Sequence, residues 1–202
     1  QETIFRLQGV IYEKELPPLK ISRYPLYLRQ HVGITGLGLS YMTRAIENLH
    51  QIFASFQRTL NQEELTPWTG DNSYQPFEGV TANCRYFTAG TNASTRQSIP
   101  FQKDVDPEGV LQQMLRDGIV HTEENAVLYM KASKSGPNLK YSDISPSSFS
   151  IGDIVEIQFT VMSIRQKEGN YKMITVLKSL TVLDDSVSMV GIERELIIHD
   201  IF

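Results

Sequence analysis

The length and composition of the chain set broad limits on its fold and function. Its 202 residues suffice for one sizeable domain or two small ones, and 41% hydrophobic with 21% charged residues is ordinary for a globular protein. The sequence contains no run of about 18 apolar residues and therefore predicts no membrane-spanning helix. The net charge of −4 argues against a protein that coats DNA generically, although it leaves room for a local basic patch.

The first part of the chain predicts two strands followed by a long helix. Segments 3–12 and 24–32 alternate moderately between apolar and polar residues, and a Leu-Pro-Pro-Leu stretch separates them. After a glycine-rich bend at 33–38, apolar residues recur at helical spacing as far as Leu60. We expect Ser40 to cap this helix. The helix should pack on a sheet or plug the end of a barrel.

The middle of the chain predicts loops with few regular elements. Residues 61–101 are rich in turn residues around a short predicted strand at 80–88. A second, short helix should begin with Asp106 as its cap and Pro107 as its first residue, and end at Gly118. A strand at 126–132 follows, then loops up to residue 150. The segment 192–202 predicts a last strand or a short helix.

The clearest pattern is a long β-hairpin from Phe149 to Asp184. A Gly-Asp turn at 152–153 precedes a strand of alternating apolar and polar residues, and the polar run 166–170 leads into the return strand. Each strand can span about 12 residues, where ~5–6 is usual. Long, twisted strands are typical of small closed barrels, and a sandwich sheet is the alternative.

These elements together predict the fold class. Strands occur in runs and do not alternate regularly with helices, which disfavours a parallel doubly wound fold. We predict an α+β fold over residues 1–202 as a single domain, with a mostly antiparallel, OB-like or related β-barrel, one long helix and one short helix. A subdivision into residues 1–100, with the N-terminal strands and helix, and 101–202, with the hairpin, is the alternative.

Three motifs outside the hairpin suggest chemistry only weakly. The glycines at 33–38 precede a helix, as in phosphate loops, but their spacing matches neither the dinucleotide fingerprint nor the P-loop. His121 stands beside two carboxylates without a second nearby histidine, so a solvated turn is favoured over a metal site. Cys84 precedes Arg85, but a buried structural cysteine is favoured over a reactive thiolate. We therefore predict no catalytic residue, metal or cofactor, and we favour a non-enzymatic role.

The best candidate for a functional surface is the cationic part of the predicted hairpin. Cations and an aromatic ring on a β-surface suit single-stranded nucleic acid, because phosphates meet the charge and exposed rings stack on bases. The alternative is a solvated outer face on which lysine protects a sheet edge. The residues in question are Arg165, Lys167, Tyr171, Lys172 and Lys178.

The remaining predictions concern partners and compartment. The lone Cys84 and the absence of signal-peptide features at the N-terminus predict an intracellular protein, nuclear or cytoplasmic. Single-stranded nucleic acid and other protein chains are both candidate partners, a membrane is not, and the oligomeric state is open. A protein-interaction or self-assembly domain is the second functional hypothesis, and an enzyme of unknown type is the third.

The C-terminal half also resembles a known group of proteins. The resemblance rests on Asp106-Pro107, Asp117-Gly118, the segments 121–125 and 127–129, Phe149 with 152–156, Lys172-Met173, and the leucine-rich pattern from Val176 to Leu183. In order and spacing these segments are similar to a large family of uncharacterised proteins abundant in mushroom-forming fungi. The resemblance implies expansion in the manner of mobile-element-associated genes, and hence nucleic-acid partners. It implies no activity or catalytic residue.

Overall fold

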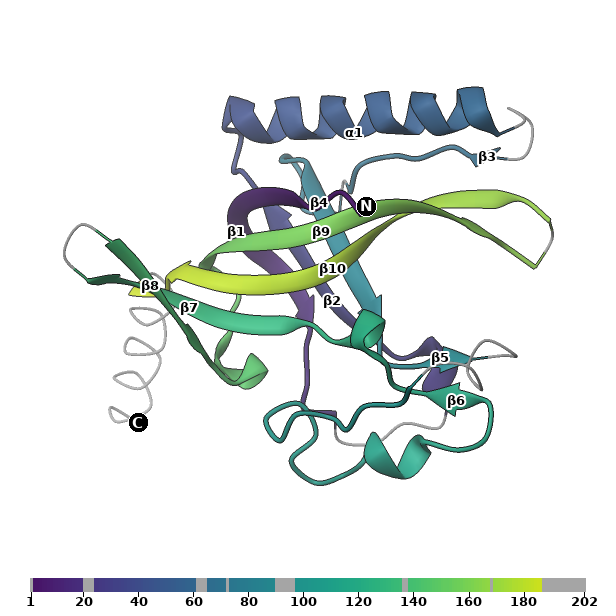
Figure 1. Cartoon of the computed structure of the whole chain (residues 1–202). Helices are drawn as coiled ribbons and strands as arrows, with labels where there is room; N and C mark the ends of the chain where they lie inside the picture. The colour runs from purple at the N-terminus through teal and green to yellow at the C-terminus, as the bar shows by residue number, and fades with distance from the viewer. Residues whose placement is uncertain are drawn as a thin grey trace, which may run out of the picture.

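The part of the chain that the structure describes forms a large curled sheet, with one α-helix on top of it (Figure 1). This is a computed structural model, and it describes residues 2–19, 24–60, 65–71, 73–89, 97–135, 138–167 and 169–186. The eight-stranded sheet contains β1 (Phe5–Glu15), β2 (Arg29–Thr35), β3 (Leu65–Thr66), β4 (Gly79–Arg85), β7 (Leu128–Ser135), β8 (Asn138–Asp143), β9 (Ile154–Arg165) and β10 (Tyr171–Asp184). A small second sheet pairs β5 (Thr88–Ala89) with β6 (Ile119–Val120), and the helix is α1 (Ser40–Thr59).

Five of these strands close into a barrel. β1 pairs antiparallel with β2 and β9, β2 pairs antiparallel with β4, and β9 pairs antiparallel with β10. The ring closes where β10 runs parallel to β4, at the pair Val176–Asn83. A five-stranded, partly open barrel of this kind is OB-like, which confirms the predicted α+β class and mostly antiparallel barrel.

The hairpin that dominates the sequence supplies two walls of this barrel. β9 and β10 pair from Tyr171–Arg165 to Asp184–Ile154, as the alternating pattern predicts. Two register shifts, between Leu177 and Ser179 and between Val182 and Asp184, interrupt the ladder. Such irregularities increase the twist and bending of a strand. They allow strands as long as β9 and β10 to curve around the barrel.

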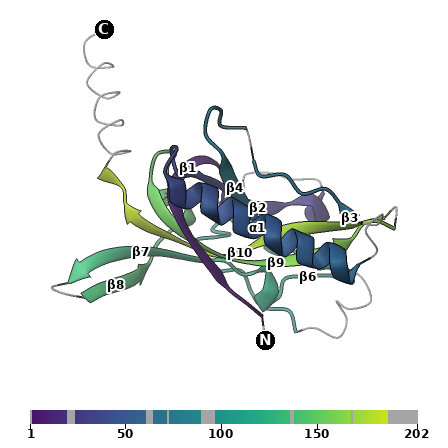
Figure 2. The same ribbon diagram turned by 90° about the horizontal axis from the view of Figure 1, so that it is seen from above.

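The apolar face of α1 covers one end of the barrel, with Met42, Ile46, Leu49 and Phe53 buried (Figures 1 and 2). Met42, Ile46 and Leu49 join the core that Leu7, Ile34, Val80, Ile157 and Leu180 fill from the strands, whereas Phe53 packs in a smaller cluster with Leu65 and Met173. At the start of α1 the predicted glycine bend is a strand-to-helix turn. A Cβ on Gly36 would lie 2.6 Å from the Cβ of Met42, and Gly38 has a φ of +85°. The glycines are therefore explained by packing and turn geometry.

The predicted second helix is wrong in extent. Asp106 does accept hydrogen bonds, from the backbone N–H groups of Leu111 (3.0 Å) and Gln112 (2.7 Å), but only one 3-10 turn forms, at Gln112–Met114. Gly109 takes a φ of +70°, outside the helical region, so the chain bends where the helix should have continued.

Three smaller predictions also need correction or comment. The helix cap is Leu39, and no side chain caps the first turn, so Ser40 is the first helical residue. β8 was not predicted, because its alternation is limited to Leu139 and Tyr141 in an otherwise polar segment, and all six of its residues are exposed. The predicted element at 192–202 lies outside the described residues.

Among the described helices, none has the length and apolar character needed to cross a membrane.

Candidate nucleic-acid interface

The outer face of β2 and β4 carries two arginines in register. Arg29 on β2 lies directly opposite Arg85 on β4, and His31 lies opposite Asn83. The residues between them alternate inward, so Gln30 and Cys84 are buried. Side chains of a strand point to opposite faces in turn, and this alternation places both guanidinium groups on the outside of the barrel.

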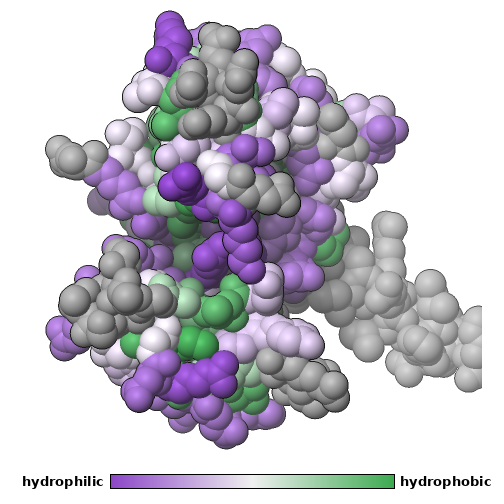
Figure 3. Space-filling model, turned by 90° about the vertical axis from the view of Figure 1, so that its right-hand side faces the viewer, coloured by the Kyte–Doolittle hydropathy of each residue, from purple (hydrophilic) through white to green (hydrophobic). Residues whose placement is uncertain are grey.

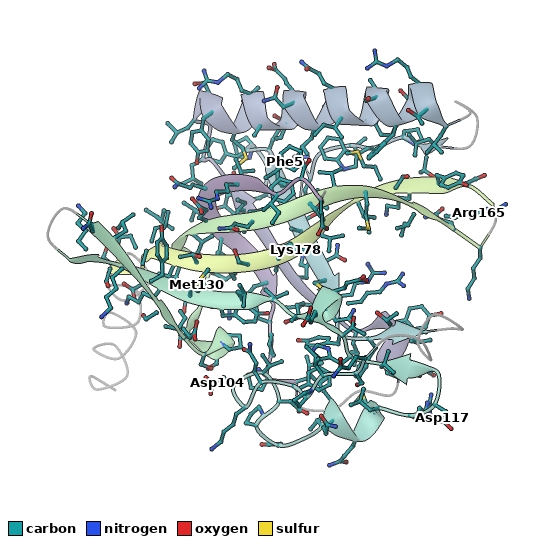
Figure 4. All side chains as sticks on the ribbon, viewed as in Figure 1. Phe5, Asp104, Asp117, Met130, Arg165 and Lys178 are labelled. Atoms are coloured by element: carbon teal, nitrogen blue, oxygen red, sulfur yellow. The ribbon has the colours of Figure 1, made fainter. Side chains whose placement is uncertain are left out.

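A third cation continues the row on β10. Val176 pairs with Asn83 across the parallel junction, and two residues further along each strand stand Lys178 and Arg85. Arg29, Arg85 and Lys178 thus lie side by side on three neighbouring strands. Arg165, at the far end of β9, completes the set of cations (Figure 4).

These four cations line one cleft of about 610 Å³. Its wall on the hairpin side is apolar, from Met162, Ile164, Ile174 and Val176. Figure 3 looks onto the side of the molecule where the hairpin ends, and it shows the surface hollowed between an upper and a lower part, with hydrophilic side chains along the hollow. The cleft therefore combines a cationic row with an apolar wall.

The positive charge in the cleft is only partly compensated. Among the described residues, Arg29, Arg85 and Arg165 form no salt bridge, whereas Lys178 Nζ lies 3.1 Å from Glu2 Oε1. Arg29 Nη1 donates a hydrogen bond of 2.8 Å to Asn83 Oδ1. Partial burial, and then the charge of Arg85, lower the pKa of Arg29 below its ordinary value. A guanidinium stays charged despite such a shift, so the site suits an anion.

The residues predicted from the sequence fall into three groups: two line the cleft, one lines an adjoining hollow, and two lie outside both. Arg165 and Lys178 line the cleft. Lys172 lines an adjoining hollow of about 290 Å³ together with Trp68, and that hollow shares Arg29 and Asn83 with the main cleft. Lys167 lies exposed in the β9–β10 turn and is not part of the cleft wall. Tyr171 is half-buried and packs against the small core cluster of Phe53, Leu65 and Met173.

The sequence reasoning missed Arg29 and Arg85 as members of this surface. They are 56 positions apart in the sequence, and only the β2–β4 register brings them together. The available signal was their place within the two predicted strands, 24–32 and 80–88. Without the pairing, that signal could not distinguish them from other exposed arginines.

His121 takes no part in a metal site, and the predicted solvated turn is wrong for it. Its ring is buried and stacks on Phe101 at a centroid distance of 3.9 Å, and Nδ1 donates to the Tyr86 carbonyl at 2.8 Å. Burial lowers the pKa of His121, an effect that the hydrogen bond to Tyr86 opposes. Within the described part of the chain, no three His, Cys, Asp or Glu side chains gather as a metal site would require.

Cys84 is the buried structural cysteine that the sequence favoured. Its side chain is enclosed in the barrel core. Burial raises the pKa of its thiol to about 11, although the charge of Lys178 lowers it slightly. The thiol is therefore protonated at neutral pH and is not an activated nucleophile.

Comparisons with known proteins give little information on the family or function of this chain. No protein-family model matches it, and no curated protein sequence matches it. Among solved structures it is similar to gp2.5, a single-stranded DNA binding protein encoded by bacteriophage T7. The two chains are 10% identical with a TM-score of 0.38, over 91% of this chain and 87% of that one. We transfer no residue role from a likeness at this level.

Proposed function

We propose that this protein is a non-enzymatic binding module for single-stranded nucleic acid. The ligand lies in the cleft that Arg29, Arg85, Arg165 and Lys178 line, which we call the arginine cleft. The observation that carries this proposal is the row of Arg29, Arg85 and Lys178 across the outer face of β2, β4 and β10. In OB folds the face of the second and third barrel strands and the adjoining loops bind oligonucleotides. In this chain β2 and β4 are those strands, and the β9–β10 turn is one of those loops.

The charge distribution supports a phosphate-bearing ligand. The protein as a whole has a net charge of −4, yet four cations and two carboxylates, Glu2 and Glu124, line this cleft, so its lining carries a net charge of +2. Sheet-edge protection does not account for the Arg29–Arg85 pair, because these two residues face each other across the paired strands β2 and β4. Uncompensated arginines on a continuous sheet are costly for the fold and favourable for a polyanion.

The apolar wall supports single strands over duplexes. Met162 is 38% exposed, and Ile164, Ile174 and Val176 are only partly covered beside it. Unpaired bases can lay their faces on such a wall, whereas a duplex presents its phosphates outward and hides those faces. The cleft thus offers charge for the backbone and apolar surface for the bases.

A direct binding measurement tests this function. We expect a fluorescently labelled oligothymidine of about 20 nucleotides to bind at low salt, with an affinity that falls as salt is added. Arg29→Gln and Arg85→Gln should each weaken binding by about tenfold, the scale of a charge-assisted contact. Arg58→Gln on α1 removes an equal charge from an exposed position outside the cleft and should leave binding unchanged. Equal loss for all three variants, or no binding by the wild type, would contradict the proposal.

A second candidate function is protein association through β8. Within the described residues this strand pairs only with β7, and it carries Leu139 and Tyr141 at 54% and 52% exposure. Figure 2 shows the β7–β8 hairpin projecting beyond the barrel. An open edge with apolar side chains is the surface used in strand addition. A mass measurement by light scattering tests it: a dimer that Leu139→Lys converts to monomer is expected, and a strict monomer rules out self-association.

A further inference from the structure

Two exposed tyrosines flank a short turn that leads into β2. Tyr24 and Tyr27 are 69% and 71% exposed, and their rings meet edge to face at a centroid distance of 6.5 Å and an angle of 82°. The turn between them is fixed, because Pro25 restricts the backbone and the Tyr27 N–H donates to the Tyr24 carbonyl at 3.1 Å. Large rings presented to solvent on a rigid turn are typical of a recognition surface.

The turn lies at one end of the arginine cleft. Tyr27 lines a hollow of about 490 Å³ together with Arg29, His31 and Asn83, and Arg29 and Asn83 also line the main cleft. Figure 1 shows the purple turn beside β5 and the end of the β9–β10 hairpin on the same side of the molecule. A ligand that crosses the cleft from Arg165 past Arg29 therefore arrives at Tyr27.

The charges beside Tyr27 differ from those of the cleft. Glu13 and Glu15 line the same hollow as Tyr27 and balance the charges of Lys14 and Arg29 there, and Glu13 Oε1 lies 2.8 Å from His31 Nε2. Carboxylates repel phosphates, but they can accept hydrogen bonds from the amino groups of bases. The excess of positive charge, and with it the preference for phosphates, is thus on the Arg85 side, whereas the balanced charges on the tyrosine side leave carboxylates available to bases.

From this arrangement we infer that Tyr24 and Tyr27 form a base-stacking platform, so that the ligand is a strand with unpaired bases at this end of the cleft. The inference rests on the proposed function and deepens it. Since the rings are nearly perpendicular, one base can stack on the face of only one of them, and the second ring meets the edge of that base or the face of the next. A duplex end does not meet this requirement, because its bases stack on each other.

Two ligands that differ only in their bases test the platform. One is the labelled oligothymidine, and the other is an abasic deoxyribose-phosphate strand of the same length. We expect the wild type to prefer the oligothymidine by about tenfold or more, the scale of stacking on one or two aromatic rings. Tyr27→Ala should remove most of that preference while leaving the abasic affinity unchanged, and Tyr27→Phe should retain it. Tyr141→Ala on β8, an exposed tyrosine (52%) that lines none of the hollows of the proposed site, should change neither affinity.

The outcomes separate this inference from the function on which it rests. If the wild type binds both strands equally, or if Tyr27→Ala binds oligothymidine as tightly as the wild type, the platform is refuted while phosphate binding in the cleft stands. If the wild type binds neither strand, both proposals fall. Thermal unfolding of Tyr27→Ala at the wild-type temperature is expected, because the side chain is mostly exposed.

Discussion

Arg29 and Arg85 stand directly opposite each other on antiparallel strands, and no described carboxylate forms a salt bridge with either. Like charges in this position destabilise a sheet by a few tenths of a kcal/mol up to about 1 kcal/mol. A protein that keeps such a pair gives up stability at the place where the cleft needs charge. Destabilising arrangements of this kind concentrate at functional sites.

This relationship predicts a gain in stability when the pair is broken. Arg85→Gln should raise the free energy of unfolding by about 0.5 kcal/mol in low salt, because the repulsion disappears while the aliphatic stem and a polar end group are kept. Urea unfolding measures the change, and added salt should reduce it. Arg58→Gln on α1 is the matched control and should show no gain. A loss of about 1 kcal/mol or more in Arg85→Gln would mean that the residue supports the fold.

Glu2 gives a prediction of the opposite sign for binding. Its Oε1 lies 3.1 Å from Lys178 Nζ, and this ion pair competes with a phosphate for the charge of Lys178 in the cleft. Glu2→Gln should tighten oligothymidine binding by about two- to fivefold, a change consistent with the small free energy of a partly exposed ion pair. Anisotropy titration measures it. Weaker binding in this variant would show that Glu2 positions Lys178 for the ligand.

Cys84 should be unreactive in the folded protein. With a thiol pKa of about 11, its thiolate fraction near pH 8 is about 200-fold below that of an ordinary cysteine with a pKa of ~8.5. Burial in the barrel slows access further. A disulfide-exchange reagent should therefore label Cys84 only after denaturant is added. Rapid labelling of the native protein would contradict the closed barrel at β4.

His121 should make stability depend on pH. Its pKa is lowered in the folded state, so the unfolded chain, with an ordinary pKa of ~6.5, binds more protons in the range between the two values. The contribution of neutral His121 to the free energy of unfolding should have its full value above about pH 6.5 and should decrease as the pH falls below that value. His121→Phe keeps a ring stacked on Phe101 and should flatten this dependence. Urea unfolding at about pH 7.5 and about pH 5.5 measures it, and equal slopes in the two proteins would refute the assignment.

Local patterns predicted the elements that a single segment determines. The alternation from Ile154 to Asp184 and the helical spacing after Ser40 both depend on neighbours in the sequence, and both elements are present. The segment after Asp106 failed because a glycine with positive φ overrides the cap and the following proline. β8 was not predicted because only two apolar residues, Leu139 and Tyr141, alternate along this exposed strand, which is too short a pattern to distinguish from a loop.

The candidate site was predictable only in part, for a different reason. Arg165 and Lys178 were found because they belong to the hairpin, whereas Arg29 and Arg85 depend on strand pairing across 54 to 56 positions of the chain. Tyr171 was grouped with the hairpin cations, yet its ring packs on Leu65 and Met173. A sequence shows which residues alternate on one strand, but the pairing decides which strands share a face. The resemblance to a fungal family stays a prediction.

The salt dependence of binding tests the central claim most directly. Each phosphate neutralised on a single strand contributes about 0.7 to the slope of log affinity against log salt concentration. We predict that Arg29→Gln/Arg85→Gln lowers the magnitude of the wild-type slope for oligothymidine by about 1.4, whereas Arg6→Gln/Arg58→Gln, which removes two exposed arginines outside the cleft, leaves it unchanged. Identical slopes for the wild type and the cleft variant would contradict the account, because the arginines would then not contact phosphates.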